Sequence, residues 1–145
     1  MFKTNNVVGC IFEDKGKFLF EKRSDKEDNY AGFWTFPMGH KRFYETKKFA
    51  LKREMHEELN IKLKFSDLVF VGTFKDIDPT SKKPYIFHIY ACKYQKIKIK
   101  GTKEQEKIEW LTLGQASKKN LRDVTKRIIL RFKKMRYLQR PNSKV

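Results

Sequence analysis

The sequence predicts a single domain of the α/β class, with strands on both sides of one central helix and a second helix near its end. A length of 145 residues is enough for one hydrophobic core and too short for two domains of ordinary size. Runs rich in β-branched and aromatic residues lie before residue 40 and again between residues 68 and 113, as is typical of strands. Apolar residues recur at helical spacing after Thr46 and after Asn120. We therefore expect residues 1–145 to form one domain that ends in a frayed tail over 140–145.

The first two strands are expected to form a hairpin. Residues 7–12 and 17–22 are apolar runs separated by a short polar segment that ends in Gly16. Because glycine adopts positive φ without a steric penalty, Gly16 is expected in the turn. Arg23 ends the second run, and a polar loop follows it.

The helix after Thr46 carries the most informative pattern of the chain. Thr46 is a suitable N-cap, and Glu54, Glu57 and Glu58 at positions i, i+3 and i+4 share one side of the helix. Three neighbouring carboxylates repel one another unless a cation neutralises them, and their oxygens suit a hard ion such as Mg²⁺ or Mn²⁺. An acidic face in contact with solvent is the alternative for the pattern alone. An adjacent apolar stripe can pack on a sheet and comprises Leu51, Met55 and Leu59.

Strands are expected again after this helix. Residues 68–74 form one run, residues 76–84 contain two prolines and predict a loop, and residues 85–94 are apolar on both alternating faces. That last pattern predicts a central strand covered on both sides. A polar loop over 101–107 and a strand over 108–113 follow.

The final helix is expected to begin near Asn120, which can cap it, and to face the core with an apolar stripe that starts at Val124. Its outer face is basic, and the chain has a formal net charge of +17, which attracts phosphates. This face could contact RNA, although a solvated surface is the simpler interpretation. The basic residues are Arg122, Lys126, Arg127, Arg131, Lys133, Lys134 and Arg136.

Composition limits the remaining classes. No apolar window of about twenty residues is available to span a bilayer, and the chain enters its first strand without an apolar signal region, so we expect a cytoplasmic protein without a membrane partner. Cys10 and Cys92 are expected to be buried, reduced thiols. We expect His88 in the core and assign no acid–base role to His40 or His56. The sequence does not indicate an oligomeric state.

The stretch over residues 39–61 resembles the Nudix box, the signature of the Nudix hydrolases, usually written Gx5Ex7REUxEExGU with U aliphatic. Gly39, Glu45 and the run REMHEE at 53–58 stand in register with it. Asn60 replaces the second glycine of the box, and asparagine also adopts the left-handed conformation that ends helices. The preceding run FWTFPMG at 33–39 is similar to the W-x-x-P-G-G approach of the family.

The resemblance implies the Nudix fold, an α/β/α sandwich with a mixed central sheet, and hydrolysis of a nucleoside diphosphate linked to another group. It implies an Mg²⁺ or Mn²⁺ site that uses the Gly39 carbonyl, Glu57 and Glu58, with Glu54 as a ligand or as the general base. Arg53 is expected to pair with the first glutamate of the box, which we expect to brace the loop.

A fourth acid is implied by the loop before the strand of Trp110. Residues 103–110 resemble the loop in MutT-like members where a glutamate six residues before the tryptophan joins the metal site. That residue is Glu104, which would be a ligand or an alternative base. Glu106 is a second candidate, and an ordinary solvated loop acid is a third interpretation.

The resemblance also suggests substrate contacts. Arg23 is expected to face the substrate phosphates, or else to be an exposed arginine at a strand end. Trp34, with Phe33 and Tyr30, could stack on a base, although Trp34 could instead pack in the sheet. Asn120 lies where MutT-like proteins place a base-reading asparagine, and helix capping competes with that role.

The resemblance is compatible with several substrates. The first choice is a MutT-like pyrophosphohydrolase of (d)NTPs or oxidised purine nucleotides that releases a monophosphate and pyrophosphate. The alternatives are a hydrolase or decapping enzyme of the RNA 5′ end and a noncatalytic nucleotide-sensing module. The intact REMHEE run argues against the last of these. In the loop between Gly39 and the helix after Thr46, Arg42 and Tyr44 depart from the MutT-like pattern. We expect them to alter the wall of the cleft.

Overall fold

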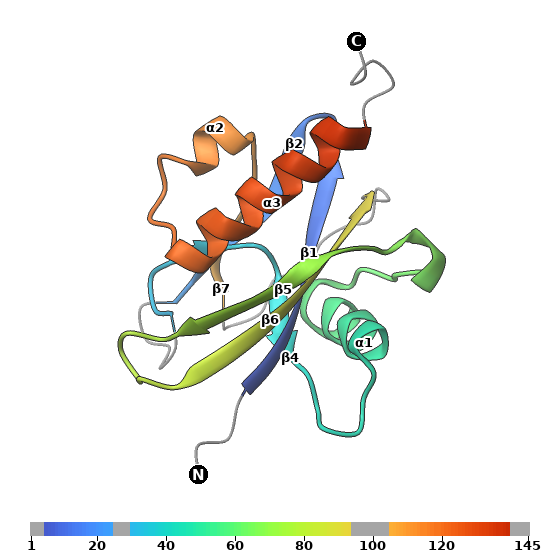
Figure 1. Cartoon of the computed structure of the whole chain (residues 1–145), viewed down its shortest axis with the longest axis vertical. Coiled ribbons are helices and arrows are strands. Elements are labelled where there is room, and N and C mark those ends of the chain that lie inside the picture. Colours follow the sequence, from blue (N-terminus) through green and yellow to red (C-terminus); the bar gives the residue numbers. More distant parts are fainter. Residues whose placement is uncertain (1–4, 25–29, 94–104, 140–145) are drawn as a thin grey trace.

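A mixed sheet lies between helices on its two faces in the computed structural model, which describes residues 5–24, 30–93 and 105–139 (Figure 1). Helix α1 (Lys47–Leu59) packs on one face, and helix α3 (Asp123–Gln139) packs on the other, beside the short helix α2 (Leu113–Ala116). The architecture is the expected α/β/α sandwich.

Within the residues that the structure describes, the sheet has seven strands, and its main path runs in the order β3-β2-β1-β6-β5. Strand β6 is parallel to β1 and antiparallel to β5, so it is a central strand, as predicted. Strand β4 pairs with β1, and β7 pairs with β2. The strands are β1 (Asn5–Asp14), β2 (Lys17–Arg23), β3 (Trp34–Thr35), β4 (Met38–His40), β5 (Val69–Ile77), β6 (Pro84–Lys93) and β7 (Gln105–Leu111), and a 3-10 turn, η1 (Phe65–Asp67), precedes β5.

Strand β1 separates two hydrophobic cores because successive side chains of a strand point to opposite faces. Val7 and Ile11 belong to the core under α3, whereas Val8, Cys10 and Phe12 belong to the core under α1. A strand buried on both faces explains why this segment is apolar without alternation.

Three local predictions are confirmed. Lys15 and Gly16, with φ of 52° and 80°, form the turn between β1 and β2, and two positive φ values are typical of a two-residue hairpin turn. The side chain of Thr46 accepts a hydrogen bond from the Phe49 N–H (3.2 Å) and caps α1. Asn60 ends α1 in the left-handed conformation with φ of 59°.

The structure corrects the start of the last helix. Helix α3 begins at Asp123 and not near Asn120. The Asn120 carbonyl accepts a hydrogen bond from the Trp34 N–H (3.0 Å), and Leu121 forms a β-bridge with Trp34. The segment is therefore extended where it joins the sheet edge, and Asn120 does not cap the helix.

Two other boundaries differ from the prediction. Strand β7 begins at Gln105 and ends at Leu111, where Thr112 caps α2. Thr112 and Gln115 form a reciprocal capping box, a sequence signal that would have predicted this short helix. The loop after β5 is shorter than residues 76–84, because pairing of β5 with β6 continues to Ile77 and Pro84.

The predicted core residues lie where expected. His88 is buried, and its ring nitrogens lie 2.9 Å from Asn6 Oδ1 and 3.4 Å from Thr73 Oγ1. Cys10 and Cys92 are free and buried. Within the described ranges, we find no helix with the length and apolar character needed to cross a membrane.

Candidate active site

The end of strand β4 lies directly against helix α1. A methyl group added at Gly39 would lie 2.3 Å from the carboxylate of Glu54, so no larger residue fits there without displacing that carboxylate. Glu54 and Glu58 are one helical turn apart, and both line the same cavity as Gly39. We call Gly39, Glu54 and Glu58 the carboxylate wall.

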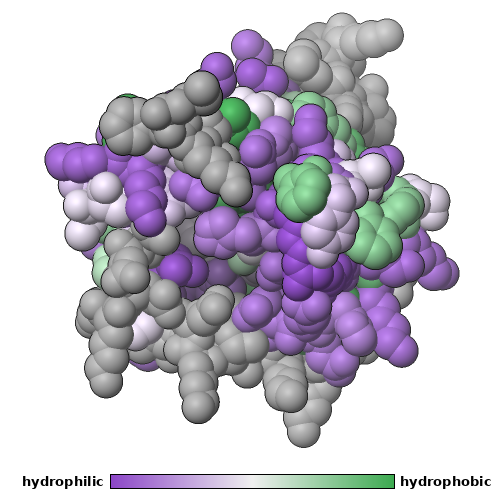
Figure 2. All heavy atoms as spheres, turned by 90° about the horizontal axis from the view of Figure 1, so that it is seen from below, coloured by the Kyte–Doolittle hydropathy of each residue, from purple (hydrophilic) through white to green (hydrophobic). Residues whose placement is uncertain are grey.

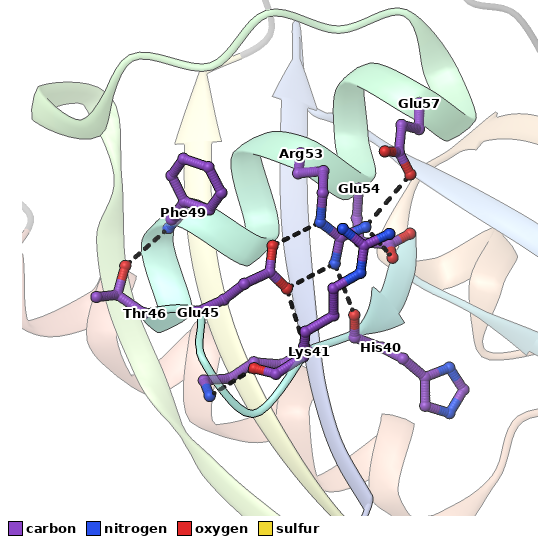
Figure 3. A network of polar contacts seen from close by, with 9 residues as sticks. His40, Lys41, Glu45, Thr46, Phe49, Arg53, Glu54 and Glu57 are labelled. Carbon is purple, nitrogen blue, oxygen red and sulfur yellow. Dashed lines mark hydrogen bonds and ion pairs between the residues drawn. The ribbon is translucent and has the colours of Figure 1, made fainter.

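Arg53 connects this helix to the loop that precedes it (Figure 3). Its guanidinium donates to both carboxylate oxygens of Glu45, from Nε to Oε2 (2.6 Å) and from Nη2 to Oε1 (2.7 Å). Nη2 also donates to the His40 carbonyl (3.0 Å), and Nη1 donates to Glu54 Oε1 (2.8 Å). The predicted pairing of Arg53 with Glu45 is thus present.

Glu45 is buried, and its carboxylate is held in the ionised form. The hydrogen bonds from Arg53 lower its pKa from 4.5 to about 2, helped by the Arg42 backbone N–H and opposed by burial. The pKa of Arg53 is raised, first through its hydrogen bonds to Glu45. Such a bidentate pair fixes both position and orientation, so Glu45 braces the loop over residues 40–46.

The three glutamates predicted to form one cluster are placed differently from one another. Glu57 is half exposed and pairs with Arg53 Nη1 at 3.3 Å, whereas Glu54 and Glu58 face the cavity. Among the residues that the structure describes, no three His, Cys, Asp or Glu side chains converge as a metal-binding group. Burial raises the pKa of Glu54, and the neighbouring Glu58 and Glu57 raise it further, while Arg53 opposes the shift.

The cavity beside the carboxylate wall has a volume of about 260 Å³. Arg23 lies in its lining, as expected, together with His40, whose pKa is lowered by burial and by the nearby Arg23. A second side of the cavity consists of aromatic rings and one arginine, and we call it the aromatic wall. Its members are Tyr30, Phe33, Tyr85, Phe87 and Arg122.

Arg122 is a site residue that the sequence interpretation missed, because it was assigned to the basic outer face of the last helix. Its guanidinium carbon lies 5.1 Å from the ring centre of Tyr30 and 5.2 Å from that of Phe33. Nη2 pairs with Asp76 Oδ2 (3.0 Å), which also accepts a hydrogen bond from the Tyr30 hydroxyl (2.9 Å). No signal at position 122 alone reveals this contact, because Asp76 lies on β5, far away in sequence.

Two predicted substrate contacts lie outside the cavity lining. Trp34 is buried in the core under α3, with Lys119 Nζ 4.7 Å from its ring centre, so its ring is used for packing. Asn120 is exposed and joins the sheet edge through its backbone.

The remaining predictions concern two loops. Arg42 and Tyr44 are exposed and do not line the cavity, so the expectation that they alter its wall is wrong. Glu104 lies outside the described residues. The backbone of Glu106 lies in strand β7.

Comparison with known proteins identifies the family. A family model described as the NUDIX domain matches residues 3–132. This chain belongs to the Nudix family. It is a Nudix hydrolase, an enzyme that acts on phosphoanhydride bonds, and members of this family generally use divalent metal ions.

Similar proteins and structures agree with this assignment. The nucleoside triphosphatase NudI of Enterobacter sp. (strain 638) is 26% identical over 133 residues, which cover 86% of this chain and 93% of NudI. The crystal structure of a MutT protein from Methanosarcina mazei Go1 has a TM-score of 0.81 at 22% identity, covering 93% of this chain and 96% of that one. The crystal structure of a MutT Nudix hydrolase from Burkholderia pseudomallei has a TM-score of 0.77 at 21% identity. The match covers 89% of this chain and 98% of that one. These two structures support the fold.

Proposed function

We propose that this Nudix hydrolase is a metal-dependent pyrophosphohydrolase of nucleoside triphosphates, with (d)NTPs or oxidised purine nucleotides as substrates. The observation that supports this proposal most directly is that the carboxylate wall and the aromatic wall line the same cavity. A nucleoside triphosphate has the matching polarity, with a flat base at one end and a polyanion at the other. The similarity to the nucleoside triphosphatase NudI is consistent with it.

The size of the cavity favours a compact substrate. Its volume of about 260 Å³ is slightly below the usual range for ligand pockets, which begins at about 300 Å³. That space suits one nucleoside with its first phosphates. The planar rings of Tyr30 and Phe33 and the guanidinium of Arg122 can stack against a base, while Arg23 can pair with phosphate oxygens.

The residues present fit a hard divalent cation. Carboxylate and carbonyl oxygens are the ligands that Mg²⁺ and Mn²⁺ prefer, and the proposed ligands are Glu54, Glu58 and the Gly39 carbonyl. The Gly39 backbone lies close to the Glu54 carboxylate, which supports ligation of one ion by both residues. We also propose Glu57 as a ligand, because its exposed pair with Arg53 costs little to rearrange. A divalent cation would neutralise charge on the diphosphate and increase the acidity of the attacking water.

The protein groups then perform three tasks. Arg53 and Glu45 hold α1 against the loop, so the carboxylates keep their positions. The aromatic wall orients the nucleoside, so that the diphosphate lies beside Glu54 and Glu58. Water attacks a phosphorus of the α–β anhydride, the bridging P–O bond breaks, and the water proton passes to a carboxylate, either Glu54 or Glu104. The products are a nucleoside monophosphate and pyrophosphate.

The test is a substrate panel assayed with Mg²⁺ and with Mn²⁺. The panel contains the common (d)NTPs, oxidised purine nucleotides, ADP-ribose, and capped or triphosphorylated RNA. We expect release of monophosphate and pyrophosphate from free triphosphates. Glu58→Gln should lower kcat by more than about 100-fold, since even changes behind metal ligands cost 10–100-fold.

A matched control removes a carboxylate elsewhere. Glu109 pairs with Lys119 outside the cavity, so Glu109→Gln should retain wild-type turnover. Full activity of Glu58→Gln at saturating metal, or no turnover of any triphosphate by the wild type, would contradict the proposal.

A further inference from the structure

The loop between β4 and α1, together with the first turn of α1, presents unusually exposed aromatic rings. Phe43 is 91% exposed, Tyr44 67% and Phe49 54%, and the rings of Phe43 and Tyr44 meet edge to face at 5.2 Å. Single exposed apolar residues are common, but neighbouring ones mark binding surfaces. Figure 2, which views the molecule from the side of this loop, shows apolar groups standing out among hydrophilic ones. We call the following exposed residues the aromatic–basic surface: Arg42, Phe43, Tyr44, Lys47, Lys48 and Phe49.

The backbone on both sides of Phe43 and Tyr44 is held by hydrogen bonds. Glu45 Oε1 accepts a hydrogen bond from the Arg42 backbone N–H (2.8 Å), and the Glu45 N–H donates to the Arg42 carbonyl (3.1 Å). Arg53 anchors both the Glu45 carboxylate and the His40 carbonyl. Because the loop backbone is already fixed at these points, the loop loses little conformational entropy when a ligand binds to the rings.

The exposed charged side chains of residues 40–49 are all basic. The carboxylate within residues 40–49 belongs to Glu45, which is buried and neutralised by Arg53. Burial lowers the pKa of His88, and the positive charges of Lys47 and Lys41 lower it further. Basic side chains that alternate with exposed rings match a ligand that carries both phosphates and flat bases.

The aromatic–basic surface follows the cavity-lining residues along the chain. Gly39 and His40 line the cavity, and the loop with Arg42 follows them directly. Along α1, Lys47 precedes Glu54 by seven positions, which is roughly 10 Å at the rise of an α-helix. About three stacked nucleotides span that distance.

We propose that the aromatic–basic surface binds single-stranded nucleic acid, and that the substrates of the site include 5′-triphosphorylated oligonucleotides whose 5′ end enters the cavity. The bases next to the 5′ end stack on Phe43, Tyr44 and Phe49, and their phosphates pair with the neighbouring basic groups. Base stacking on aromatic side chains contributes about 1–3 kcal/mol per base and tolerates any sequence.

The outer face of α3 is the competing surface for RNA. It is basic, but over residues 123–136, the part of the helix whose side chains the structure describes, the exposed large apolar residue is Leu130 and no aromatic side chain is exposed. Arg127 donates to the Lys75 carbonyl, and Arg136 pairs with Glu13, so part of its charge already serves the fold. Stacking therefore favours the loop of β4 and α1 over α3.

The substrate part of this inference rests on the proposed hydrolase activity, whereas the binding part does not. With an oligonucleotide, water forms a P–O bond at the α–β anhydride, the bridging P–O bond breaks, and the water proton passes to a site carboxylate. The products are a 5′-monophosphorylated strand and pyrophosphate.

Binding is tested without turnover, by fluorescence anisotropy in EDTA. The probes are a labelled RNA of about 12 nucleotides with a 5′ hydroxyl and a DNA of the same sequence, a length typical of such sites. We expect the double variant Phe43→Ser/Tyr44→Ser to weaken binding about tenfold or more. Lys47→Ala/Lys48→Ala should reduce the slope of log K against log salt by about 1.4, or 0.7 per phosphate contact.

Matched variants on α3 supply the controls. Leu130→Ser removes an exposed apolar side chain, and Lys133→Ala/Lys134→Ala removes two adjacent charges. Both should leave the affinity within about twofold, since they lie outside the aromatic–basic surface. All the substituted side chains are exposed, so thermal unfolding should confirm that each variant is folded.

The catalytic assay compares two substrates, a free nucleoside triphosphate and a 5′-triphosphorylated RNA as long as the binding probe. In Phe43→Ser/Tyr44→Ser, kcat/KM should fall about tenfold for the RNA and stay at the wild-type value for the free nucleotide. If the wild type binds RNA but releases pyrophosphate from no triphosphate, the proposed function is refuted and the proposed binding surface is still supported.

Three outcomes would overturn the binding inference. They are absence of RNA and DNA binding by the wild type, a larger loss in the α3 controls than in the loop variants, and loop-dependent binding to anionic phospholipid vesicles without nucleic acid binding. Equal affinity for RNA and DNA would support it as a surface for any single strand, and tighter RNA binding would assign it to RNA.

Discussion

The carboxylate wall and the aromatic wall face the same cavity but are assembled differently along the chain. The carboxylate wall comes from residues 39–58, from one short strand and the helix after it. The aromatic wall combines three segments that are distant in sequence, around Tyr30, around Tyr85 and at Arg122 just before α3. These segments come together only in the folded protein. The difference indicates that the proposed chemistry is encoded locally and that substrate choice depends on tertiary structure.

The largest effect is expected from Glu45, which holds the carboxylate wall without facing the cavity. Glu45→Ala leaves the guanidinium of Arg53 without its bidentate partner, so we expect a loss of about 3 kcal/mol in the free energy of unfolding. Urea denaturation at neutral pH measures this loss. An unchanged midpoint would show that the loop is held by its backbone alone.

Acid titration tests the same pair with a defined sign. The pKa of Glu45 is about 2 in the folded protein and 4.5 ordinarily, so its contribution is present above pH 4.5 and is lost as the pH falls toward 2. The stability difference between wild type and Glu45→Gln should therefore be constant near neutrality and shrink in acid. A difference that grows in acid would contradict this assignment.

The two walls also explain what the sequence could predict. Thr46 and Asn60 are predicted correctly because helix capping and helix ending depend on residues near them along the chain, whereas the pairing of Glu45 with Arg53 follows from the resemblance to the Nudix box. Arg122 was missed because its partners, Tyr30 and Asp76, are distant in sequence. Helical spacing placed Glu57 beside Glu54 and could not show that Arg53 draws it away from the cavity.

The next effect concerns the aromatic wall. Arg122→Ala should raise KM for a nucleoside triphosphate about tenfold, or about 1.4 kcal/mol, with little change in kcat, because Arg122 lies beside Tyr30 and Phe33 and is not one of the proposed metal ligands. Steady-state kinetics separates the two constants. Arg122→Lys keeps the charge next to Asp76 and loses the planar stacking group. Compared with Arg122→Ala, it should therefore restore most of the stability but little of the lost substrate affinity.

A neighbouring arginine provides the control for that variant. Arg127 also joins α3 to β5, through a hydrogen bond to the Lys75 carbonyl (2.6 Å), but it does not line the cavity. Arg127→Ala should therefore leave KM unchanged. Equal KM values for the two alanine variants would mean that Arg122 only fastens the helix, and the aromatic wall would lose its proposed role in substrate choice.

The smallest effect is expected at the end of the helix that carries the carboxylate wall. Asn60 holds φ of 59°, and its N–H donates to the His56 carbonyl, so the position requires a left-handed backbone and no particular side chain. Asn60→Gly should therefore stabilise the protein by less than about 1 kcal/mol, whereas Asn60→Ala should destabilise it by a similar amount, since the left-handed conformation strains other residues. Both variants should keep wild-type kcat, because the backbone continues to end α1 in the same way. Thermal unfolding with parallel kinetics checks both points, and a loss of turnover in Asn60→Gly would show that the asparagine side chain, and not only its conformation, contributes to the site.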